Sequence, residues 1–120
     1  MAVVYVFIGG GLGSCLRFAI HHLLDKYSLN FPFATIVANA LACLLFGFIA
    51  GYLIKENISD QYRLLLLTGV CGGFSTFSTF TQDSFKLIET GQILYLFGNI
   101  ILSVLVCLVF LFLGYKWSGQ

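Results

Sequence analysis

Four long runs of apolar residues, joined by short polar segments, make up almost all of this chain. They cover residues 2–24, 33–54, 62–87 and 93–115. A helix needs about 20 apolar residues to cross a bilayer, so each run is long enough to form a transmembrane helix. Only 9% of the 120 residues are charged, whereas soluble domains carry about 25%. The sequence therefore predicts an all-α membrane protein, with residues 1–120 forming a single domain of four transmembrane helices.

The charged and sulfur-bearing residues exclude several classes of function. The net charge is +1 and the basic residues form no patch, so we expect no nucleic-acid partner. One cysteine falls in each apolar run, and no two have the short spacing of a metal site. We interpret all four as reduced core residues. The sequence shows no serine–histidine arrangement of a nucleophilic enzyme, so we do not expect an enzyme.

The third run contains the most unusual segment of the chain. Residues 69–80 read Gly-Val-Cys-Gly-Gly-Phe-Ser-Thr-Phe-Ser-Thr-Phe. Each glycine weakens a helix by about 1 kcal/mol relative to alanine, and the hydroxyl side chains compete for backbone hydrogen bonds. A break in a helix frees carbonyl groups, which coordinate small hard cations, and N–H groups, which attract anions. We therefore expect the third helix to be broken in mid-membrane and to carry an ion site.

Phe74, Phe77 and Phe80 recur at every third position of this segment. One interpretation is that their rings pack in the core. The alternative is that ring edges, which carry partial positive charge, line a pore and contact a small anion. Such a contact would hold the ion weakly enough to release it, as conduction requires. The residues themselves leave both interpretations open.

Polar residues in the first two runs have similar alternatives. Arg17 either tethers the end of the first helix at the interface or faces a water-filled vestibule. Thr35 and Asn39 lie four residues apart, on one helical face. Asn39 either makes an interhelical hydrogen bond or points an N–H donor into a pore. His21 and His22, near the end of the first run, are expected to be solvated interfacial residues.

The fourth run carries a polar stripe along one face of an otherwise apolar helix. Its members recur at every fourth position and are Tyr95, Asn99, Ser103 and Cys107. Polar residues thus occur at membrane depth in several of the runs. A purely structural helper subunit would not explain them.

The basic residues give almost no preferred orientation in the membrane. Four spans place both termini and the loop at residues 55–63 on one side. Three basic residues lie on that side: Lys55, Arg63 and Lys116. The other side has two, Lys26 and Lys86, or three if Arg17 is counted there. The positive-inside rule needs a bias to choose an orientation. We therefore expect insertion both ways round, and pairing of two copies as an antiparallel, dual-topology homodimer.

Three motifs of this chain occur together in one known family. They are the glycines at 9, 10 and 13 followed by Arg17, the asparagine at 39, and the run from Gly72 to Phe80. Together they resemble the small bacterial fluoride channels of the CrcB or Fluc family, over nearly the whole chain. The resemblance implies passive, fluoride-specific efflux that lowers cytoplasmic fluoride and its toxicity. It also implies an antiparallel homodimer of four-helix subunits among the lipids of the bacterial cell membrane.

The resemblance further implies roles for individual residues. Phe77 and Phe80 would line the fluoride pathway, with Asn39 as a fluoride-contacting donor. The remaining residues of the pathway would be Thr35, Ser78, Thr79, Ser103, Asn99 and Tyr95. Arg17 would line an aqueous vestibule. The backbone carbonyls of Gly72 and Ser75 would bind a structural sodium ion (Na+), which is not transported, at the dimer centre.

Two classes of transporter compete with the channel. A small multidrug-type proton antiporter shares the length, the four spans and the dual topology, and a fluoride/proton antiporter shares the substrate. Both need an ionisable group at membrane depth. The first two spans contain no carboxylate, and Asp83, which stands where the family often has a glutamate, lies near a helix end. A channel is therefore the preferred interpretation.

Overall fold

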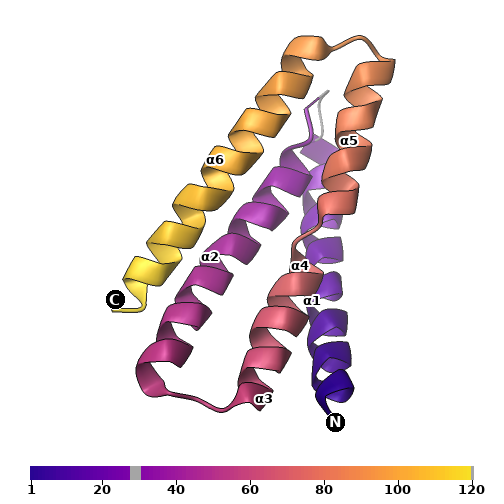
Figure 1. Cartoon of the computed structure of the whole chain (residues 1–120). Helices are drawn as coiled ribbons and strands as arrows, with labels where there is room; N and C mark the ends of the chain where they lie inside the picture. The colour runs from indigo at the N-terminus through magenta and orange to yellow at the C-terminus, as the bar shows by residue number, and fades with distance from the viewer. Residues whose placement is uncertain (28–30, 120) are drawn as a thin grey trace.

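The computed structural model describes residues 1–27 and 31–119, and every regular element within these residues is helical. The elements in chain order are α1 (Ala2–Leu24), the 3₁₀ turn η1 (Asp25–Tyr27), α2 (Phe33–Glu56), α3 (Asp60–Arg63), the π-helical stretch η2 (Leu64–Cys71), α4 (Gly72–Phe74), α5 (Phe77–Glu89) and α6 (Ile93–Trp117). The molecule is elongated, with extents of 49 × 29 × 21 Å. The chain runs alternately up and down its long axis (Figure 1).

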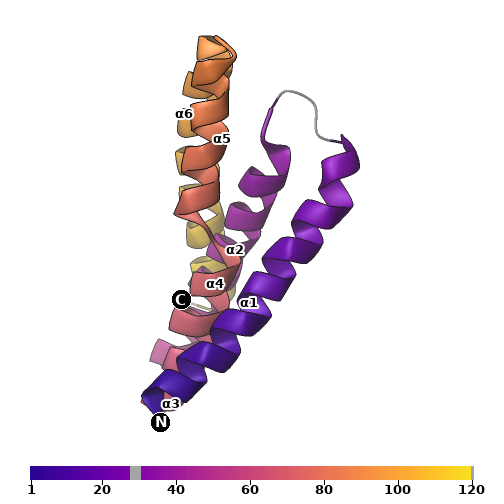
Figure 2. The ribbon, with the colours of Figure 1, turned by 90° about the vertical axis from the view of Figure 1, so that its right-hand side faces the viewer.

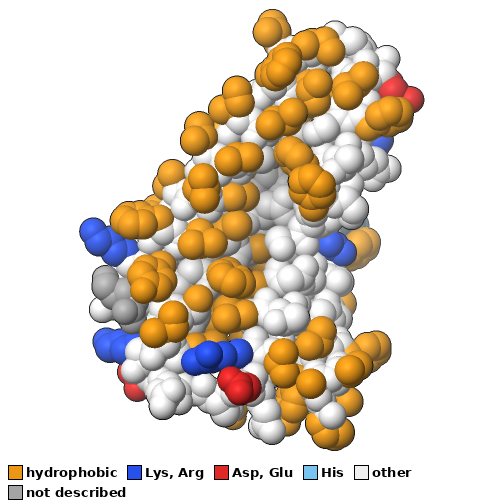
Figure 3. All heavy atoms as spheres, in the orientation of Figure 1, with side chains coloured by type: hydrophobic (Ala, Val, Ile, Leu, Met, Phe, Trp, Pro, Cys, Tyr) orange, Lys and Arg blue, Asp and Glu red, His pale blue; other side chains and the backbone are white. Residues whose placement is uncertain are grey.

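Four of its helical stretches are long and apolar enough to cross a membrane: Ala2–Leu24, Phe33–Glu56, Asp60–Glu89 and Ile93–Trp117. The third comprises the whole series from α3 to α5. The four predicted spans are thus confirmed as membrane-capable helices. The last three extend a few residues beyond the predicted bounds, because helical hydrogen bonding continues into the polar residues that flank each apolar run. Hydrophobic side chains cover most of the surface seen in Figure 3.

Glycines bring α1 against the first half of the third span. A Cβ on Gly9 would overlap the carbonyl oxygen of Leu65, and one on Gly13 would overlap that of Val70. On the opposite side of the contact, a Cβ on Gly73 would meet the backbone of α1. The two backbones can approach this closely only because side chains are missing, as in other membrane helix pairs with glycines four residues apart. In Figures 1 and 2, α1 lies alongside η2 and α4.

A second glycine contact joins α2 to α6. A Cβ on Gly47 would overlap the carbonyl oxygen of Leu111, and one on Gly114 would overlap that of Leu44. These two helices run in the same direction and form the most extensive helix pair of the fold (Figure 1). The contact fixes which residues of α2 and α6 face each other.

The helical backbone of the third span is interrupted between α4 and α5. Ser75 and Thr76 have extended backbone angles, with ψ of 155° and 126°, and α5 begins at Phe77. Beyond this point α5 packs on α6 instead of α1. In Figure 2, α4 lies beside α1, whereas α5 lies away from it. The depth of this interruption in a bilayer stays a prediction.

Candidate functional site

The interruption is held by a side chain of α2. The amide nitrogen of Asn39 donates to the carbonyl oxygen of Thr76 at 3.1 Å, and the Thr76 N–H donates to the amide oxygen of Asn39 at 2.8 Å. An asparagine side chain carries both a donor and an acceptor, so it can pair with an extended residue as a neighbouring β-strand would. Asn39 therefore satisfies both backbone groups of a residue that the helices on either side cannot reach.

Thr76 also begins the next helix. Its hydroxyl oxygen accepts a hydrogen bond from the Thr79 N–H at 3.2 Å, which is the usual contact of a threonine at a helix N-cap. The hydroxyl groups of Thr76 and Ser78 lie 3.0 Å apart and share a further hydrogen bond. Thr76 is thereby fixed through its backbone by α2 and through its side chain by α5.

Because of these contacts, the N–H groups of Thr76 and Thr79 do not form the hydrogen bonds that they would form in a continuous helix. In a regular α-helix the N–H of Thr76 would bond to the carbonyl of Gly72, and that of Thr79 to the carbonyl of Ser75. Here the first donates to Asn39 and the second to the hydroxyl of Thr76. The carbonyls of Gly72 and Ser75 are therefore released from the helical pattern. Gly72 is exposed on the face turned away from α1.

An open groove of about 290 Å³ lies beside the interruption. We call it the phenylalanine groove; its lining includes Asn39, Ser75, Thr76, Phe77, Phe80 and Ser103. The rings of Phe77 and Phe80 are 5.5 Å apart between centroids and tilted by 32°. Phe77 is 78% exposed in the single chain. The groove thus places aromatic rings next to an amide and hydroxyl groups, and it is open on one side.

Hydrogen bonds from α6 hold α5 in place at the far side of this groove. Asn99 is 1% exposed, and its amide nitrogen donates to the hydroxyl oxygen of Ser84 at 3.1 Å. The hydroxyl of Ser103 donates in turn to the amide oxygen of Asn99 at 3.2 Å. The buried part of the α6 stripe therefore links two helices, whereas Ser103 also reaches the groove.

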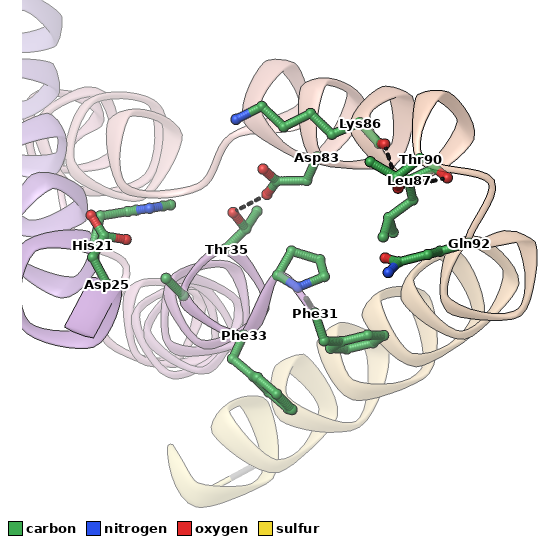
Figure 4. A pocket seen from close by; sticks show the side chains of 12 residues that line it. His21, Asp25, Phe31, Phe33, Thr35, Asp83, Lys86, Leu87, Thr90 and Gln92 are labelled. Atoms are coloured by element: carbon green, nitrogen blue, oxygen red, sulfur yellow. Dashed lines mark hydrogen bonds between the residues drawn. The ribbon is translucent and has the colours of Figure 1, made fainter. Parts of the chain in front are cut away.

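A second, polar cavity of about 330 Å³ lies between the ends of α1, α2 and α5 (Figure 4). Within it the Thr35 hydroxyl donates to a carboxylate oxygen of Asp83 at 2.6 Å, a short hydrogen bond of the charge-assisted kind. Thr35 is 2% exposed, so its hydroxyl needs this partner. Lys86 and His21 also line the cavity, which therefore contains ionisable groups of both signs.

The prediction that both histidines are solvated is wrong for His21. Its Nε2 atom is buried, and no hydrogen-bond partner for it lies within the described part of the chain. The reason is tertiary packing: His21, near the end of α1, lines the polar cavity together with residues at the start of α2 and on α5. His22, on the next position of the helix, is exposed as predicted.

Comparison with known proteins identifies the family. The sequence profile described as "CrcB-like protein, Camphor Resistance (CrcB)" matches residues 4–115. The chain belongs to this CrcB-like family. A relative from Flavobacterium psychrophilum is 43% identical, with 98% of this chain and 92% of the relative aligned. Relatives from Pyrococcus horikoshii (42% identical; 94% and 92% aligned) and Desulfotalea psychrophila (37%; 100% and 94%) are similar over the same length. All three are named "Fluoride-specific ion channel FluC".

In this CrcB-like chain the structure brings together some of the predicted pathway residues. Asn39, Phe77, Phe80 and Ser103 line one groove, with Ser75 beside them. Ser78 and Thr79 surround the Thr76 hydroxyl at the start of α5. Thr35 lies apart from these residues, in the polar cavity.

Other predicted residues lie elsewhere in the fold. Tyr95 is 46% exposed and packs edge-on against Phe31, with ring centroids 5.9 Å apart. Asn99 bonds to Ser84 between two helices. Arg17 is partly buried on α1 and does not contribute to the lining of the groove or the polar cavity. The roles of these residues in conduction stay predictions. The arrangement of the four helices around a conducting path also stays a prediction. The chain itself is a multi-pass membrane protein of the cell membrane.

Sequence reasoning missed one residue of the site, Ser84. Thr76, in contrast, belongs to the hydroxyl residues of the 69–80 segment that were expected to compete for backbone hydrogen bonds, and it does so as the N-cap of α5. Ser84 gave no local signal. Its role depends on Asn99, and only the packing of α5 on α6 brings the two together.

Proposed function

We propose that this chain is a subunit of a fluoride-specific ion channel that lets fluoride leave the cell passively and so lowers its cytoplasmic concentration and toxicity. The observation that carries the proposal is the phenylalanine groove. It brings two tilted aromatic rings, an amide and hydroxyl groups together at an interrupted helix. Family membership supports the choice of ion, since the relatives carry the name of fluoride channels.

The groove has the chemistry to bind a small, hard anion weakly. Ring edges of Phe77 and Phe80 offer partial positive charge without a full charge. Asn39 gives one amide hydrogen to Thr76, and an amide nitrogen has a second hydrogen for an anion. The hydroxyl of Ser103 can turn toward the groove. Binding by such groups is strong enough to replace water and weak enough to release the ion.

The polar cavity would serve as one mouth of the pathway. Lys86 provides positive charge that attracts anions, and Thr35 and Asp83 lie deeper, between α2 and α5. Because Asp83 is an anion, it would oppose fluoride unless the Thr35 hydroxyl keeps it oriented away from the path. Thr35 is therefore assigned as a positioning residue for Asp83 as well as a pathway hydroxyl.

A second copy of the chain in antiparallel orientation would close the groove. Phe77 and Gly72 are both exposed in a single chain, and a Cβ on Gly72 would meet no atom of α1 within 4 Å. An open groove lined by hydroxyl groups is unfavourable against lipid tails, so a protein partner is needed there. Dual topology, which the balanced basic residues favour, would supply that partner from the same gene product.

The residues present fit a structural sodium ion at the centre of such a dimer. The carbonyls of Gly72 and Ser75 are the ones whose helical donors are redirected to Asn39 and Thr76. Two carbonyls from each subunit would form a cage of oxygen ligands, which suits a hard cation. When bound, the cation would neutralise the converging carbonyl dipoles and hold the two interrupted helices together. Asn39 and Thr76 supply the geometry by keeping those carbonyls out of the helical pattern.

One observation favours a second candidate, a fluoride/proton antiporter. Asp83 is partly enclosed in the polar cavity and is hydrogen bonded to Thr35, and an enclosed carboxylate is the group that proton coupling requires. Its position at the end of the pathway, rather than in the groove, makes the channel the better-supported function.

Fluoride release from purified protein tests the proposal. Liposomes containing the protein are loaded with potassium fluoride and diluted into fluoride-free buffer, and valinomycin is added to carry potassium. We expect rapid fluoride release, measured with a fluoride electrode, only after valinomycin is added, because a channel moves net charge. An antiporter would also need valinomycin, because a fluoride ion leaving and a proton entering both make the liposome interior more positive. It would, however, take up protons as fluoride leaves, so a rise in external pH that accompanies fluoride release would identify the antiporter. Replacing fluoride by chloride should abolish the flux.

A variant connects the flux to the groove. Phe80→Ile keeps an apolar side chain but removes the ring edge, so flux should fall sharply while the protein still purifies as the same species. Phe85→Ile, a matched change at an exposed position on the same helix, should retain flux. Equal flux from both variants would remove the ring edge from the mechanism.

A further inference from the structure

Two cysteines lie at one end of the phenylalanine groove, on the two helices that form the most extensive pair of the fold. Cys43 on α2 and Cys107 on α6 both contribute to the lining of the groove. Cys43 is one helical turn beyond Asn39, and Cys107 is one turn beyond Ser103. The thiols therefore continue the polar surface of the groove beyond its amide and hydroxyl groups.

The register of the two helices places these two cysteines at the same level. Gly47 and Leu111, one turn farther along α2 and α6, are in backbone contact. One turn earlier on each helix, Cys43 and Cys107 lie at the same level of the helix pair, and both line the phenylalanine groove. Both side chains are partly buried, and neither is in a disulfide. A pair of free thiols opens into the proposed ion path.

We propose that Cys43 and Cys107 form a binding site for a soft, thiol-seeking metal ion such as Ag⁺, Cu⁺ or Hg²⁺, and that metal binding blocks the groove. Sulfur ligands select soft ions, and these ions accept two sulfurs arranged on opposite sides. On binding, each S–H bond breaks as an S–metal bond forms, and both protons leave to water in the groove. The oxidation state of the metal does not change.

The blocking part of this inference rests on the proposed function. A metal ion between the two sulfurs would lie one turn from Asn39 and Ser103, the donors assigned to fluoride. It would occupy part of a groove of only about 290 Å³. An ion path conducts only if no site on it holds or excludes the ion too strongly. A tightly bound metal ion in the groove would make fluoride bind too strongly or exclude it, and conduction would stop.

Silver ion provides a direct test, because silver fluoride is soluble and chloride can be omitted from the buffers. Silver nitrate is added to the liposome flux assay described above, with wild-type protein and with Cys43→Ser, Cys107→Ser and Cys15→Ser. We expect silver to stop wild-type flux and dithiothreitol to restore it. Loss of one sulfur should raise the inhibitory silver concentration by at least about tenfold, since even changes next to a metal ligand cost about 10- to 100-fold in affinity.

Cys15→Ser is the matched control, because this cysteine is exposed on α1, contrary to the prediction that all four cysteines are core residues, and lies outside the groove. It should remain as sensitive to silver as the wild type. Persistent wild-type flux in silver, or equal sensitivity of Cys43→Ser and Cys107→Ser to that of Cys15→Ser, would overturn the blocking site.

A binding measurement separates failure of this inference from failure of the proposed function. Detergent-solubilised protein is treated with a maleimide in the presence and absence of silver, and labelling of each cysteine is read by mass spectrometry. Silver should protect Cys43 and Cys107 together, and substitution of either should remove protection of the other. This result requires no fluoride flux. Independent labelling of the two thiols in silver would contradict the site even if the protein conducts fluoride.

Discussion

The two halves of the third span, before and after Ser75, are held by different kinds of contact. Before it, η2 and α4 pack on α1 through backbone-to-backbone contacts at glycines such as Gly13 and Gly73. After it, side-chain hydrogen bonds join α5 to Asn99 of α6 and to Thr35 of α2. At these glycines no side chain lies between the two helices. The second half depends on polar groups that can exchange partners with water or ions.

This difference suggests a division of labour within one span. A backbone contact is rigid, and it suits the half whose carbonyls would form the sodium cage. Hydroxyl and amide side chains can offer hydrogen bonds to a passing ion, and they suit the half that faces the groove. Asn39 lies at the boundary of the two halves. It fixes Thr76, the extended residue that separates them.

The largest effect is expected from disturbing the glycine contact. Gly13→Ala places a methyl group on the backbone of Val70, so the helices must separate, and overpacking of this kind costs about 1–3 kcal/mol or more. The temperature at which the protein loses monodispersity in detergent should fall clearly. Gly11→Ala is the matched control: a Cβ there meets nothing within 4 Å, and alanine improves helix propensity by up to about 1 kcal/mol. Equal stability of the two variants would contradict the claim that backbone contact at glycines holds the first half of the span on α1.

The next largest effect is expected at the boundary residue. Asn39→Asp keeps an oxygen for the Thr76 N–H but replaces the donor to the Thr76 carbonyl by a second oxygen. A buried group left without its partner costs about 1–3 kcal/mol. We expect loss of most fluoride flux in the liposome assay, with the protein still purified intact. Asn57→Asp makes the same chemical change at the exposed end of α2 and should retain flux. Normal flux in Asn39→Asp would show that the two halves do not depend on this residue.

A smaller effect is expected from the polar cavity. Thr35→Val removes the hydroxyl bonded to Asp83 while keeping the shape of the side chain. Hydrogen bonds to charged groups contribute about 1.5–3 kcal/mol, so Asp83 should lose its fixed orientation. Flux should fall less than in Asn39→Asp. The control is Thr81→Val, since Thr81 is exposed and its hydroxyl bonds only within its own helix, to Phe77. A larger loss in Thr81→Val than in Thr35→Val would argue against the assigned role.

The smallest effect is expected where hydrogen bonds hold α5 without touching the groove. Ser84→Ala removes the acceptor for the Asn99 amide and should cost about 1 kcal/mol of stability. Flux per molecule should stay close to the wild-type value, because the residue positions a helix and binds no ion. A flux loss comparable to that of Asn39→Asp would place Ser84 on the ion path.

The arrangement of long helices was predictable from the sequence, and the pairing of polar groups was not. Apolar runs above the length of a bilayer determine where helices form, with ends uncertain by a few residues. The partners of Asn39 lie 37 residues away, and no local pattern encodes such a separation. The same applies to His21, whose Nε2 atom is buried and which lines a cavity with residues of α2 and α5. The π-helical form of η2 was also unpredictable, since glycine and leucine side chains give no signal for it.

The amide pairing at residue 39 has a consequence for how this gene can vary. The contact needs a donor and an acceptor side by side on a side chain of one length. Glutamine, the other amide residue, cannot be reached from an asparagine codon by a single base change. Every one-step amino-acid substitution at this codon should therefore be defective in a growth screen under fluoride stress. Neighbouring lipid-facing codons, in contrast, should accept many apolar substitutions.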